Sequence, residues 1–293
     1  MNVVDAIVIG VSLGCVYGLV AIGFSLIYRT TGVLNFAQGG FVMVGGMLAA
    51  YSATAWGLSL PAAALVGIGA AGLTGLLLAF GVIFPLWRRR ASSFIVILGT
   101  LLFMVALENV VLNTMGSNPL AVPPVSPDLR LEAGSVSVDA QVLWIVLATV
   151  LLAVALNRYL RATRGGVAMR ACSIDQSVSR TLGISPLRVG LVAIGVAALI
   201  GGLAGVLIGP LQFTAYSVGH AYNIKGFLAA ILGGLGNVRG AVVGGIIVGL
   251  FEAFVAIYLT TAYLDVLVLL ALVVILFVRP QGIFPEVETA RHA

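Results

Sequence analysis

Long apolar runs alternate with short polar connections along most of this chain. Most runs approach or exceed about 20 residues, the length of a helix that crosses a bilayer, whereas barrel strands are about ten residues long and alternate in polarity. The pattern therefore predicts an all-α integral membrane protein, a polytopic helical bundle of about eight or nine membrane segments. The apolar segments lie at roughly 6–28, 33–52, 59–86, 94–115, 141–157, 188–212, 223–236, 241–260 and 263–278.

The composition supports a membrane-embedded chain. Of the 293 residues, 61% are hydrophobic and 9% are charged, and the mean hydropathy is +1.17. Ordinary soluble domains carry about 25% charged residues. The formal net charge of +5 would suit a nucleic-acid partner, but the cations cluster between apolar runs without interleaved aromatic residues. We therefore expect no nucleic-acid role.

The distribution of the cations predicts the orientation of the chain. Lysine and arginine gather in short loops on the inner side of a membrane. If the basic segment 157–188 lies inside and every apolar segment crosses, only Arg130 and Lys225 of the fifteen cations fall outside. We therefore expect the N-terminus outside and the C-terminus inside.

A single membrane domain is expected over residues 1–293. It divides into a first repeat over about 5–115, an external loop over 117–139, an inner loop over 157–188 and a second repeat over about 188–279. Within the external loop, the stretch LRLEAGSVSV predicts a short hairpin. This loop is equally consistent with a contact for an external partner and with a simple connector.

Two short, glycine-rich segments resemble one another, and both begin with asparagine. NFAQGGFVMVGG starts at Asn35 and NIKGFLAAILGG starts at Asn223. In the predicted orientation the two copies cross in opposite directions. Inverted repeats with short broken helices indicate a transport pathway near the bilayer midplane, whereas tight helix packing alone is the alternative explanation. The preceding runs share a small-residue face, formed by Gly10, Gly14 and Gly18 in the first and Gly201, Gly205 and Gly209 in the second.

The starts of these two segments form the candidate pathway. A helix that starts inside the membrane has free N–H groups and a positive dipole end, which favour a carboxylate. We expect irregular backbone over 36–40 and 224–226, which is tolerated where it lines a cavity. The alternative is that these residues only fix the helix starts. The candidate pathway residues are Asn35, Phe36, Gln38, Gly39, Asn223 and Gly226.

The inner loop predicts a short, bounded helix over 173–182. Ser173, followed three residues later by Gln176, has the pattern of a capping box, and Gly183 fits a left-handed C-terminal cap. The dipeptide Ser185-Pro186 then starts the next helix, as an N-cap followed by proline at the first helical position.

One side of this short helix is apolar. Ile174, Val178 and Leu182 recur every four residues and form a narrow stripe. The loop over 157–188 also carries six arginines and one acid, Asp175. A capped helix with an apolar stripe, placed in a loop of a membrane protein, indicates docking of another protein. The arginines have an ordinary explanation as orientation signals.

No catalytic or metal-binding constellation stands out, so we expect neither an enzyme nor a cofactor or metal bound by this chain. Walker A, HExxH and CxxC patterns are absent from the sequence, and His220 is isolated. Glu108 and Glu252 fall inside predicted spans, where an acid marks either an interhelical bond or a pathway role. Because no string of acids or histidines accompanies them, a proton-driven carrier is disfavoured.

Three stretches together resemble the LivH type of permease from branched-chain amino-acid ABC importers. They are GVSLGCVYGLVAIGFSLIYRTTGVLNFAQGGFVMVGG, RACSIDQSVSRTLGIS and FLAAILGGLGNVRGAVVGGIIVGLFE. The resemblance covers nearly the whole chain. It implies a permease in a bacterial inner membrane, which forms half of a pathway with a second, related permease in a heterodimer. It also implies two cytoplasmic ATPases that use ATP and Mg²⁺, and a periplasmic substrate-binding protein.

The resemblance further assigns the inner-loop helix as a coupling helix that sits in a cleft of the ATPase. Gln38 departs from the histidine that is frequent in the family. The family also includes carriers of amides, urea and other small acids, so such a cargo is one alternative, and a self-contained secondary transporter or channel is another. The implied coupling residues are Ser173, Ile174, Asp175, Val178, Arg180, Leu182 and Gly183.

Overall fold

The computed structural model describes residues 3–126, 130–133, 136–258, 263–278 and 282–284. The first part of the chain forms α1 (Val3–Thr31), α2 (Gln38–Ala55), α3 (Leu60–Leu78), the π-helical stretch η1 (Ala79–Ile83), α4 (Phe84–Arg88) and α5 (Ser93–Met115). The middle forms β1 (Arg130–Ala133), β2 (Val136–Asp139), α6 (Ala140–Ala162), α7 (Arg164–Ile174) and α8 (Gln176–Thr181). The last part forms α9 (Pro186–Ile208), α10 (Val218–Gly233), α11 (Val238–Tyr258) and α12 (Leu264–Val278).

Six helices in the described part of the chain are long and apolar enough to cross a membrane. They are α1, the continuous helix α3–η1–α4, α5, α6, α9 and α11. These helices confirm the prediction of a polytopic helical membrane protein. Among them α1 is the most buried, and α5 and α6 expose many large aliphatic side chains on their outer sides, as expected for surfaces in contact with lipid.

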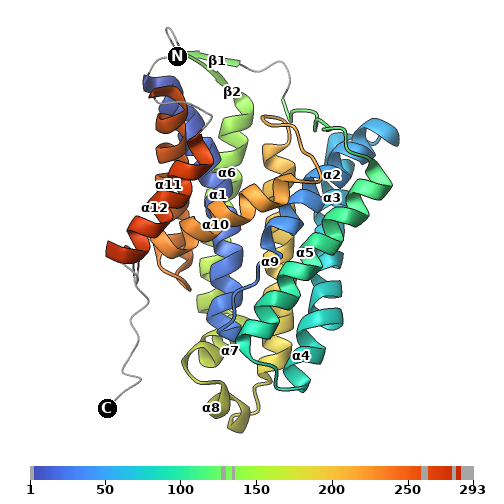
Figure 1. Ribbon diagram of the computed structural model, residues 1–293, viewed down its shortest axis with the longest axis vertical. Coiled ribbons are helices and arrows are strands. Elements are labelled where there is room, and N and C mark those ends of the chain that lie inside the picture. Colours follow the sequence, from blue (N-terminus) through green and yellow to red (C-terminus); the bar gives the residue numbers. More distant parts are fainter. Residues whose placement is uncertain (1–2, 127–129, 134–135, 259–262, 279–281, 285–293) are drawn as a thin grey trace.

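The helices form an elongated bundle with two distinct ends (Figure 1). The hairpin of β1 and β2 lies at one end, with α1 beginning near it, and α7 and α8 lie at the other. The predicted hairpin is confirmed, because β1 pairs with β2 in antiparallel register from Arg130 opposite Asp139 to Ala133 opposite Val136.

Glycines allow the central helices to pack backbone against backbone. α1 packs on α11, and a side-chain carbon added at Gly14 would lie 2.6 Å from the Cα atom of Ile246. α9 packs on α2, and the same addition at Gly205 would overlap the carbonyl oxygen of Val42. Such small-residue contacts suit helices in lipid, where close packing replaces water expulsion as the driving force.

Two sets of three helices run through the bundle in opposite senses. α1, α2 and α3 follow one another down, up and down in Figure 1, and α9, α10 and α11 run up, down and up. The sets are interleaved, since α1 contacts α11 and α10, while α9 contacts α3 and α2. The first helix of each set therefore packs against the second and third helices of the other set.

The two asparagine-led segments differ in their local structure. α2 begins at Gln38, so Asn35 and Phe36 precede the helix as predicted, whereas residues 38–40, which were expected to be irregular, are helical. The expectation for the second segment is wrong, because α10 begins at Val218 and residues 224–226 are helical. The loop after α9 ends early enough that an additional turn of helix forms before Asn223.

Candidate functional site

The connection between α1 and α2 breaks the helical path inside the bundle. Asn35 is buried, and its side-chain oxygen accepts a hydrogen bond of 3.0 Å from the backbone N–H of Ala37. The hydroxyl of Thr100 on α5 accepts a bond of 3.0 Å from the N–H of Phe36. These side chains satisfy backbone groups that a continuous helix would have paired internally.

Asn223 fastens α10 to the same break. Its amide nitrogen donates to the carbonyl oxygen of Phe36 at 2.9 Å, and its oxygen accepts from the N–H of Gly39 at 3.2 Å. The two asparagines that lead the related segments therefore meet within one hydrogen-bonded group. We name this group, Asn35, Phe36, Gly39 and Asn223, the junction.

Glycine is required at the junction because the two helices approach closely. A side-chain carbon at Gly39 would overlap the carbonyl oxygen of Gly219 and lie 2.8 Å from the Cβ of Asn223. Gly226, one turn further along α10, would in turn overlap the side chain of Val20. Both predicted glycines thus have a packing role at the crossing of α10 with its neighbours.

Two buried amide side chains at the junction keep one polar atom without a hydrogen-bond partner among the described residues. They are Asn35, through its amide nitrogen, and Gln38, through its side-chain oxygen. The nitrogen of Gln38 donates to the carbonyl oxygen of Ala197 on α9 at 3.0 Å. Because an unpaired buried polar atom costs about 1–3 kcal/mol, such atoms mark a place where a polar molecule would gain hydrogen bonds.

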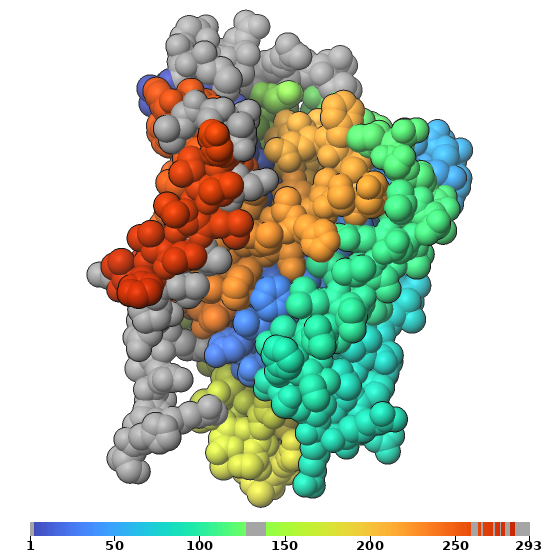
Figure 2. Space-filling model, in the orientation of Figure 1, coloured from blue at the N-terminus to red at the C-terminus, as the bar shows by residue number. Residues whose placement is uncertain are grey.

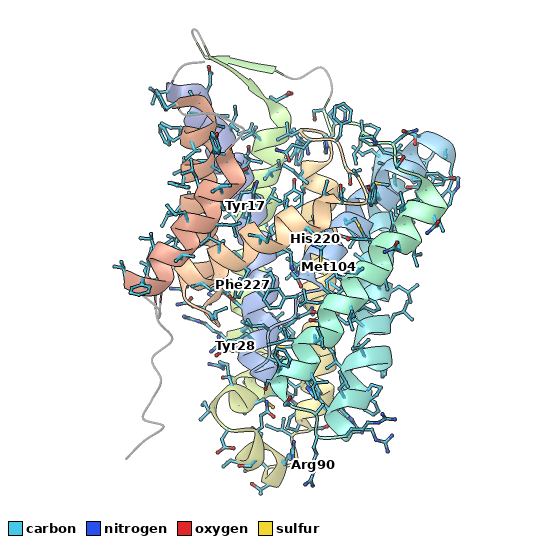
Figure 3. The ribbon with its side chains drawn as sticks, viewed as in Figure 1. Tyr17, Tyr28, Arg90, Met104, His220 and Phe227 are labelled. Carbon is cyan, nitrogen blue, oxygen red and sulfur yellow. The ribbon has the colours of Figure 1, made fainter. Side chains whose placement is uncertain are left out.

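Aromatic rings cover the junction on one side. The ring of Phe36 lies 6.0 Å from that of Phe24 on α1 and 5.1 Å from that of Phe227 on α10. Phe36 and Phe227 are half-buried. Figure 3 shows Phe227 and Met104 near the middle of the bundle, and Figure 2 shows the α1–α2 connection at the surface between α10 and α5. The site therefore combines buried amides with an accessible apolar cover.

An acid and a histidine join α5 to α10 beside the junction. A side-chain oxygen of Glu108 lies 2.9 Å from Nε2 of His220, and Glu108 is buried while the histidine is exposed. The sequence expectation that His220 is isolated is therefore wrong. Of the two roles considered for Glu108, this contact supplies an interhelical bond.

A buried ion pair lies on the other side of α10. Nζ of Lys225 is 2.6 Å from one oxygen of Glu252 on α11, and the hydroxyl of Tyr17 on α1 donates to the other at 2.7 Å. Counting the membrane crossings predicts Lys225 on the outer side, but it is buried inside the bundle within α10. The pair ties three helices together, which gives Glu252 an interhelical structural bond.

At the α8 end of the molecule, the cap of the short helix differs from the prediction. Asp175, rather than Ser173, is the N-cap of α8, and its carboxylate accepts bonds from the N–H groups of Ser177 and Val178 at 2.7 and 3.2 Å. Ser173 lies inside α7, where its hydroxyl donates to the carbonyl of Arg170. The short helix therefore spans Gln176–Thr181.

The other boundaries agree with the sequence. Gly183 has φ +80°, as a left-handed cap requires, and the Ser185 hydroxyl accepts a bond from the N–H of Arg188 at the start of α9.

The apolar stripe of the loop is exposed. Ile174, Val178 and Leu182 have relative exposures of 70%, 53% and 71%. The amide of Gln176, in contrast, turns inward and donates to the carbonyl oxygens of Thr30 and Thr31, at 3.4 and 3.3 Å. These carbonyls belong to the last turn of α1. α8 is thus fixed to the end of α1 and presents its apolar side outward.

A groove of about 480 Å³ runs beside α8. It is lined by Arg180 from α8, by Arg88 and Arg90 from the end of the α3–η1–α4 helix, and by Trp87. Figure 3 shows Arg90 at this end of the bundle. We name the stripe and the groove together the docking face, after the role that the sequence predicts for it; it combines exposed aliphatic side chains with cations.

A bundle of apolar helices, with a broken helix fixed by buried amides at its centre, defines this chain as a multi-pass membrane protein. The chain belongs to the family described as branched-chain amino acid transport system / permease component, whose sequence model matches residues 6–277. No solved structure matches the chain.

Curated relatives carry the same description. The high-affinity branched-chain amino acid transport system permease protein LivH of Escherichia coli (strain K12) is 34% identical, over 95% of each chain. BraD of Pseudomonas aeruginosa, named as a permease protein of the same kind of system, is 29% identical over 95% of each chain. LivM of Escherichia coli (strain K12) is 25% identical over 94% of this chain and 69% of its own. These relatives are named as transport permeases, not as enzymes.

Sequence reasoning missed several residues of the site. Thr100 and Tyr17 form hydrogen bonds to the site from other helices, so no pattern of neighbouring residues in the sequence indicates their roles. The pairing of Lys225 with Glu252 had a usable signal, because two opposite charges in neighbouring apolar segments are costly unless they meet.

Proposed function

We propose that this chain is the permease subunit of an ATP-driven importer, that it forms half of a translocation pathway together with a second, related permease, and that separate ATPases supply the energy. The observation that carries the proposal is the exposed apolar stripe on and directly beside α8 in a member of this permease family. Aliphatic side chains at the end of a membrane bundle gain stability by docking into a partner. The docking face is the surface for the ATPase.

The contacts of α8 supply a route for coupling. Gln176 bonds to the end of α1 through Thr30 and Thr31, and only three residues separate Thr31 from Asn35. A movement of α8 would therefore act on the short connection that holds the junction. We propose that closure of the ATPases moves α8 and α1 together, and that this motion opens the junction alternately to the two sides.

The pathway in this proposal passes the junction. Asn35 and Gln38 contribute the unpaired amide atoms, and Phe36 with Phe227 contributes an apolar surface. An amino acid with a branched aliphatic side chain carries both polar and apolar groups, so it matches this combination. Gly39, Asn223 and Gly226 shape the pathway by holding α10 close to α1 and α2.

We also propose an inverted internal repeat and the orientation that the cations indicate. The opposite senses of α1–α3 and α9–α11, and their interleaved contacts, support the repeat. The arginines of the α8 end support a cytoplasmic location for that end, which puts the N-terminus outside and the C-terminus inside a bacterial inner membrane. The docking face is then on the side where ATP is present.

The cargo follows from the relatives. LivH, LivM and BraD are named for branched-chain amino acids, and we propose leucine, isoleucine and valine, delivered by a periplasmic binding protein. An importer of the same architecture for urea, amides or small carboxylic acids is the second candidate. The departure from the family's frequent histidine at Gln38 favours keeping that candidate in the test.

Purification from native membranes in mild detergent, followed by mass spectrometry, tests the assembly. We expect two ATPase subunits and a second permease to accompany the chain. Proteoliposomes containing this complex and the binding protein should then accumulate leucine only when ATP and Mg²⁺ are supplied. Uptake by the chain alone, driven by an ion gradient, would instead identify a secondary carrier. Uptake of urea or amides but not of leucine would assign the second cargo.

A further inference from the structure

Glu108 and Glu252 are the buried acids among the described residues, and their carboxylates are paired differently. Glu252 has a partner for each oxygen, because Nζ of Lys225 lies 2.6 Å from one and the hydroxyl of Tyr17 donates to the other at 2.7 Å. Glu108 has a partner for one oxygen only, within the part of the chain that the structure describes. Nε2 of His220 lies 2.9 Å from its Oε2, whereas its Oε1 is buried without a hydrogen-bond partner. Glu108 therefore keeps an acceptor that Glu252 has already used.

An interhelical bond does not by itself require an acid at position 108. A glutamine there would also accept a hydrogen bond from His220, and it would carry no charge into a membrane helix. An ionised side chain at membrane depth is costly, and a buried carboxylate oxygen without a donor adds a desolvation penalty. Oε1 of Glu108 is therefore a position at which a ligand with N–H donors would gain a hydrogen bond.

The pair of Glu108 and His220 lies one helical turn from the junction. Glu108 follows Met104 on α5 by four residues, and a side-chain carbon added at Gly219 would lie 3.2 Å from the Cε atom of Met104. His220 precedes Asn223 on α10 by three residues, and Figure 3 shows His220 next to Met104. Because α5 runs from the α8 end toward the hairpin end in Figure 1, Glu108 lies on the hairpin side of the junction.

His220 connects the buried carboxylate with the surface of the bundle. The side chain of His220 is 55% exposed, and that of Glu108 is 11% exposed. Ionisable side chains at membrane depth face the bundle interior or a water-filled cavity rather than lipid. An exposed imidazole in contact with a buried acid therefore indicates that the surface between α5 and α10, which Figure 2 shows, faces water or another protein. A polar ligand can approach Glu108 from this side.

We propose that Glu108 binds the ammonium group of an amino acid that moves from the hairpin end toward the junction. An ammonium group supplies three N–H donors and a positive charge, so it pairs Oε1 and compensates the charge of the carboxylate. A rotation of the His220 side chain away from the bundle opens the approach. The amide nitrogen of Asn35, which has no acceptor among the described residues, suits the carboxylate of the same ligand further along the pathway.

This inference rests on the proposed function and makes its cargo more specific. Urea, amides and simple carboxylic acids carry no ammonium group. A carboxylate that waits beside the junction therefore favours amino acids over the second candidate cargo.

The binding of three probes tests the ammonium site on the full-length chain, purified with its native partners but without the binding protein. The probes are leucine, isoamylamine, which lacks the carboxylate of leucine, and isocaproate, which lacks its ammonium group. Saturation-transfer NMR in nanodiscs measures the dissociation constant of each probe. Leucine and isoamylamine should bind about tenfold more tightly than isocaproate, because a charge-assisted hydrogen bond is at stake. Equal binding of the three probes, or no binding of the two ammonium compounds, overturns the proposal.

The variant Glu108→Gln isolates the charge, since glutamine keeps an oxygen that accepts from His220. It should weaken the binding of leucine and isoamylamine about tenfold and leave the dissociation constant of isocaproate unchanged. A purely structural role of Glu108 would weaken all three probes alike, and that result overturns the proposal. If Glu108→Gln yields no folded protein, Glu108→Asp decides, because withdrawing the carboxylate by one carbon should also weaken the two ammonium probes selectively. Asp139→Asn removes an exposed acid at the hairpin end and should bind all probes like the wild type.

ATP-dependent uptake of leucine separates a failure of this inference from a failure of the proposed function. In proteoliposomes with the binding protein, Glu108→Gln should raise the KM for leucine about tenfold. If the wild type imports leucine and Glu108→Gln imports it with the same KM and rate, the importer stands and the role of Glu108 is wrong. If the wild type imports no leucine, but its preference for isoamylamine over isocaproate depends on Glu108, the ammonium site stands and the proposed cargo or assembly is wrong.

Discussion

The surroundings of α10 and the docking face of α8 use polar and apolar groups in opposite ways. Around α10 the polar groups are buried and paired, as with Asn223 at the junction and Lys225 with Glu252. On α8 the amide of Gln176 turns inward to the end of α1, whereas the aliphatic side chains of Val178 and, directly after the helix, Leu182 are exposed. Asn223, Lys225 and Glu252 find their partners within the chain, whereas the described residues leave the aliphatic side chains of the second region uncovered.

Because of this difference, we expect substitutions around α10 to change the stability of the fold and substitutions on α8 to change the interaction with a partner. A buried polar contact removed from α10 leaves its partner unpaired in an apolar interior, so the folded state loses free energy. An exposed aliphatic side chain on α8 contributes little to the folded state, because it is solvent-accessible already. Substitutions in the first region should therefore lower the free energy of unfolding, and substitutions in the second should weaken the docking of a partner protein.

The largest effect is expected at the closest approach of the helices. Gly39→Leu would force α2 and α10 apart and break both hydrogen bonds of Asn223, since even one added carbon overlaps the carbonyl of Gly219. We expect a loss of about 4–5 kcal/mol or more in the free energy of unfolding, and little folded protein in the membrane. Detergent extraction followed by size-exclusion chromatography measures the folded fraction.

The matched control is Gly69→Leu on α3, where an added carbon meets nothing within 4 Å. It should accumulate like the wild type. If Gly39→Leu gives as much monodisperse protein as Gly69→Leu, then α10 is not held tightly at the junction and the contrast with α8 is weaker than described.

A smaller loss is expected when the buried ion pair is broken. Lys225→Met leaves Glu252 with the hydroxyl of Tyr17 as its partner among the described residues, so the free energy of unfolding should fall by about 3 kcal/mol. Adding Glu252→Gln to the same chain removes the unpaired charge and should restore part of that loss. Thermal unfolding of the two single variants and the double variant in one detergent completes the cycle. Additive losses in the double variant would show that the two groups do not interact.

The smallest effect on stability is expected on α8. Val178→Asp should change the free energy of unfolding by only about 0.5 kcal/mol, because the side chain is 53% exposed. ATP-dependent uptake by the assembled complex should nevertheless be lost, since a charge replaces an apolar docking group. Val167→Asp on α7, with 49% exposure, is the control and should transport normally. Normal uptake by Val178→Asp would remove the docking face from the proposal.

Patterns of neighbouring residues predicted the helices, the C-terminal cap and the hairpin, because interactions within a few residues decide these features. Each apolar run became a helix, and the cap at Gly183 and the hairpin at β1–β2 formed where turn chemistry required them. The N-cap of α8 was misassigned because Ser173 and Asp175 are both capping residues two positions apart. Asp175 provides a carboxylate that accepts two backbone bonds, which stabilises the later start.

Contacts between distant segments could not be predicted in this way. Counting the membrane crossings predicts Lys225 on the outer side, but Glu252, which also accepts a bond from Tyr17, pairs with it inside the bundle. Asn223 fits a helix start by its residue type, yet its partners Phe36 and Gly39 lie more than a hundred positions away along the chain. In both cases the deciding interaction appears only when the helices are assembled.

The π-helical stretch Ala79–Ile83 changes which side chains face a given neighbour along the continuous helix α3–η1–α4. One additional residue in a turn rotates everything beyond it by about 100° relative to a regular α-helix. Before the stretch, Gly75 faces Ala198 of α9, and after it Trp87 lies over Gly190 of the same helix. The parts of this helix before and after the π-helical stretch therefore make separate contacts with α9. The end beside α8 can rotate or shift while the packing of Gly75 deeper in the bundle stays unchanged.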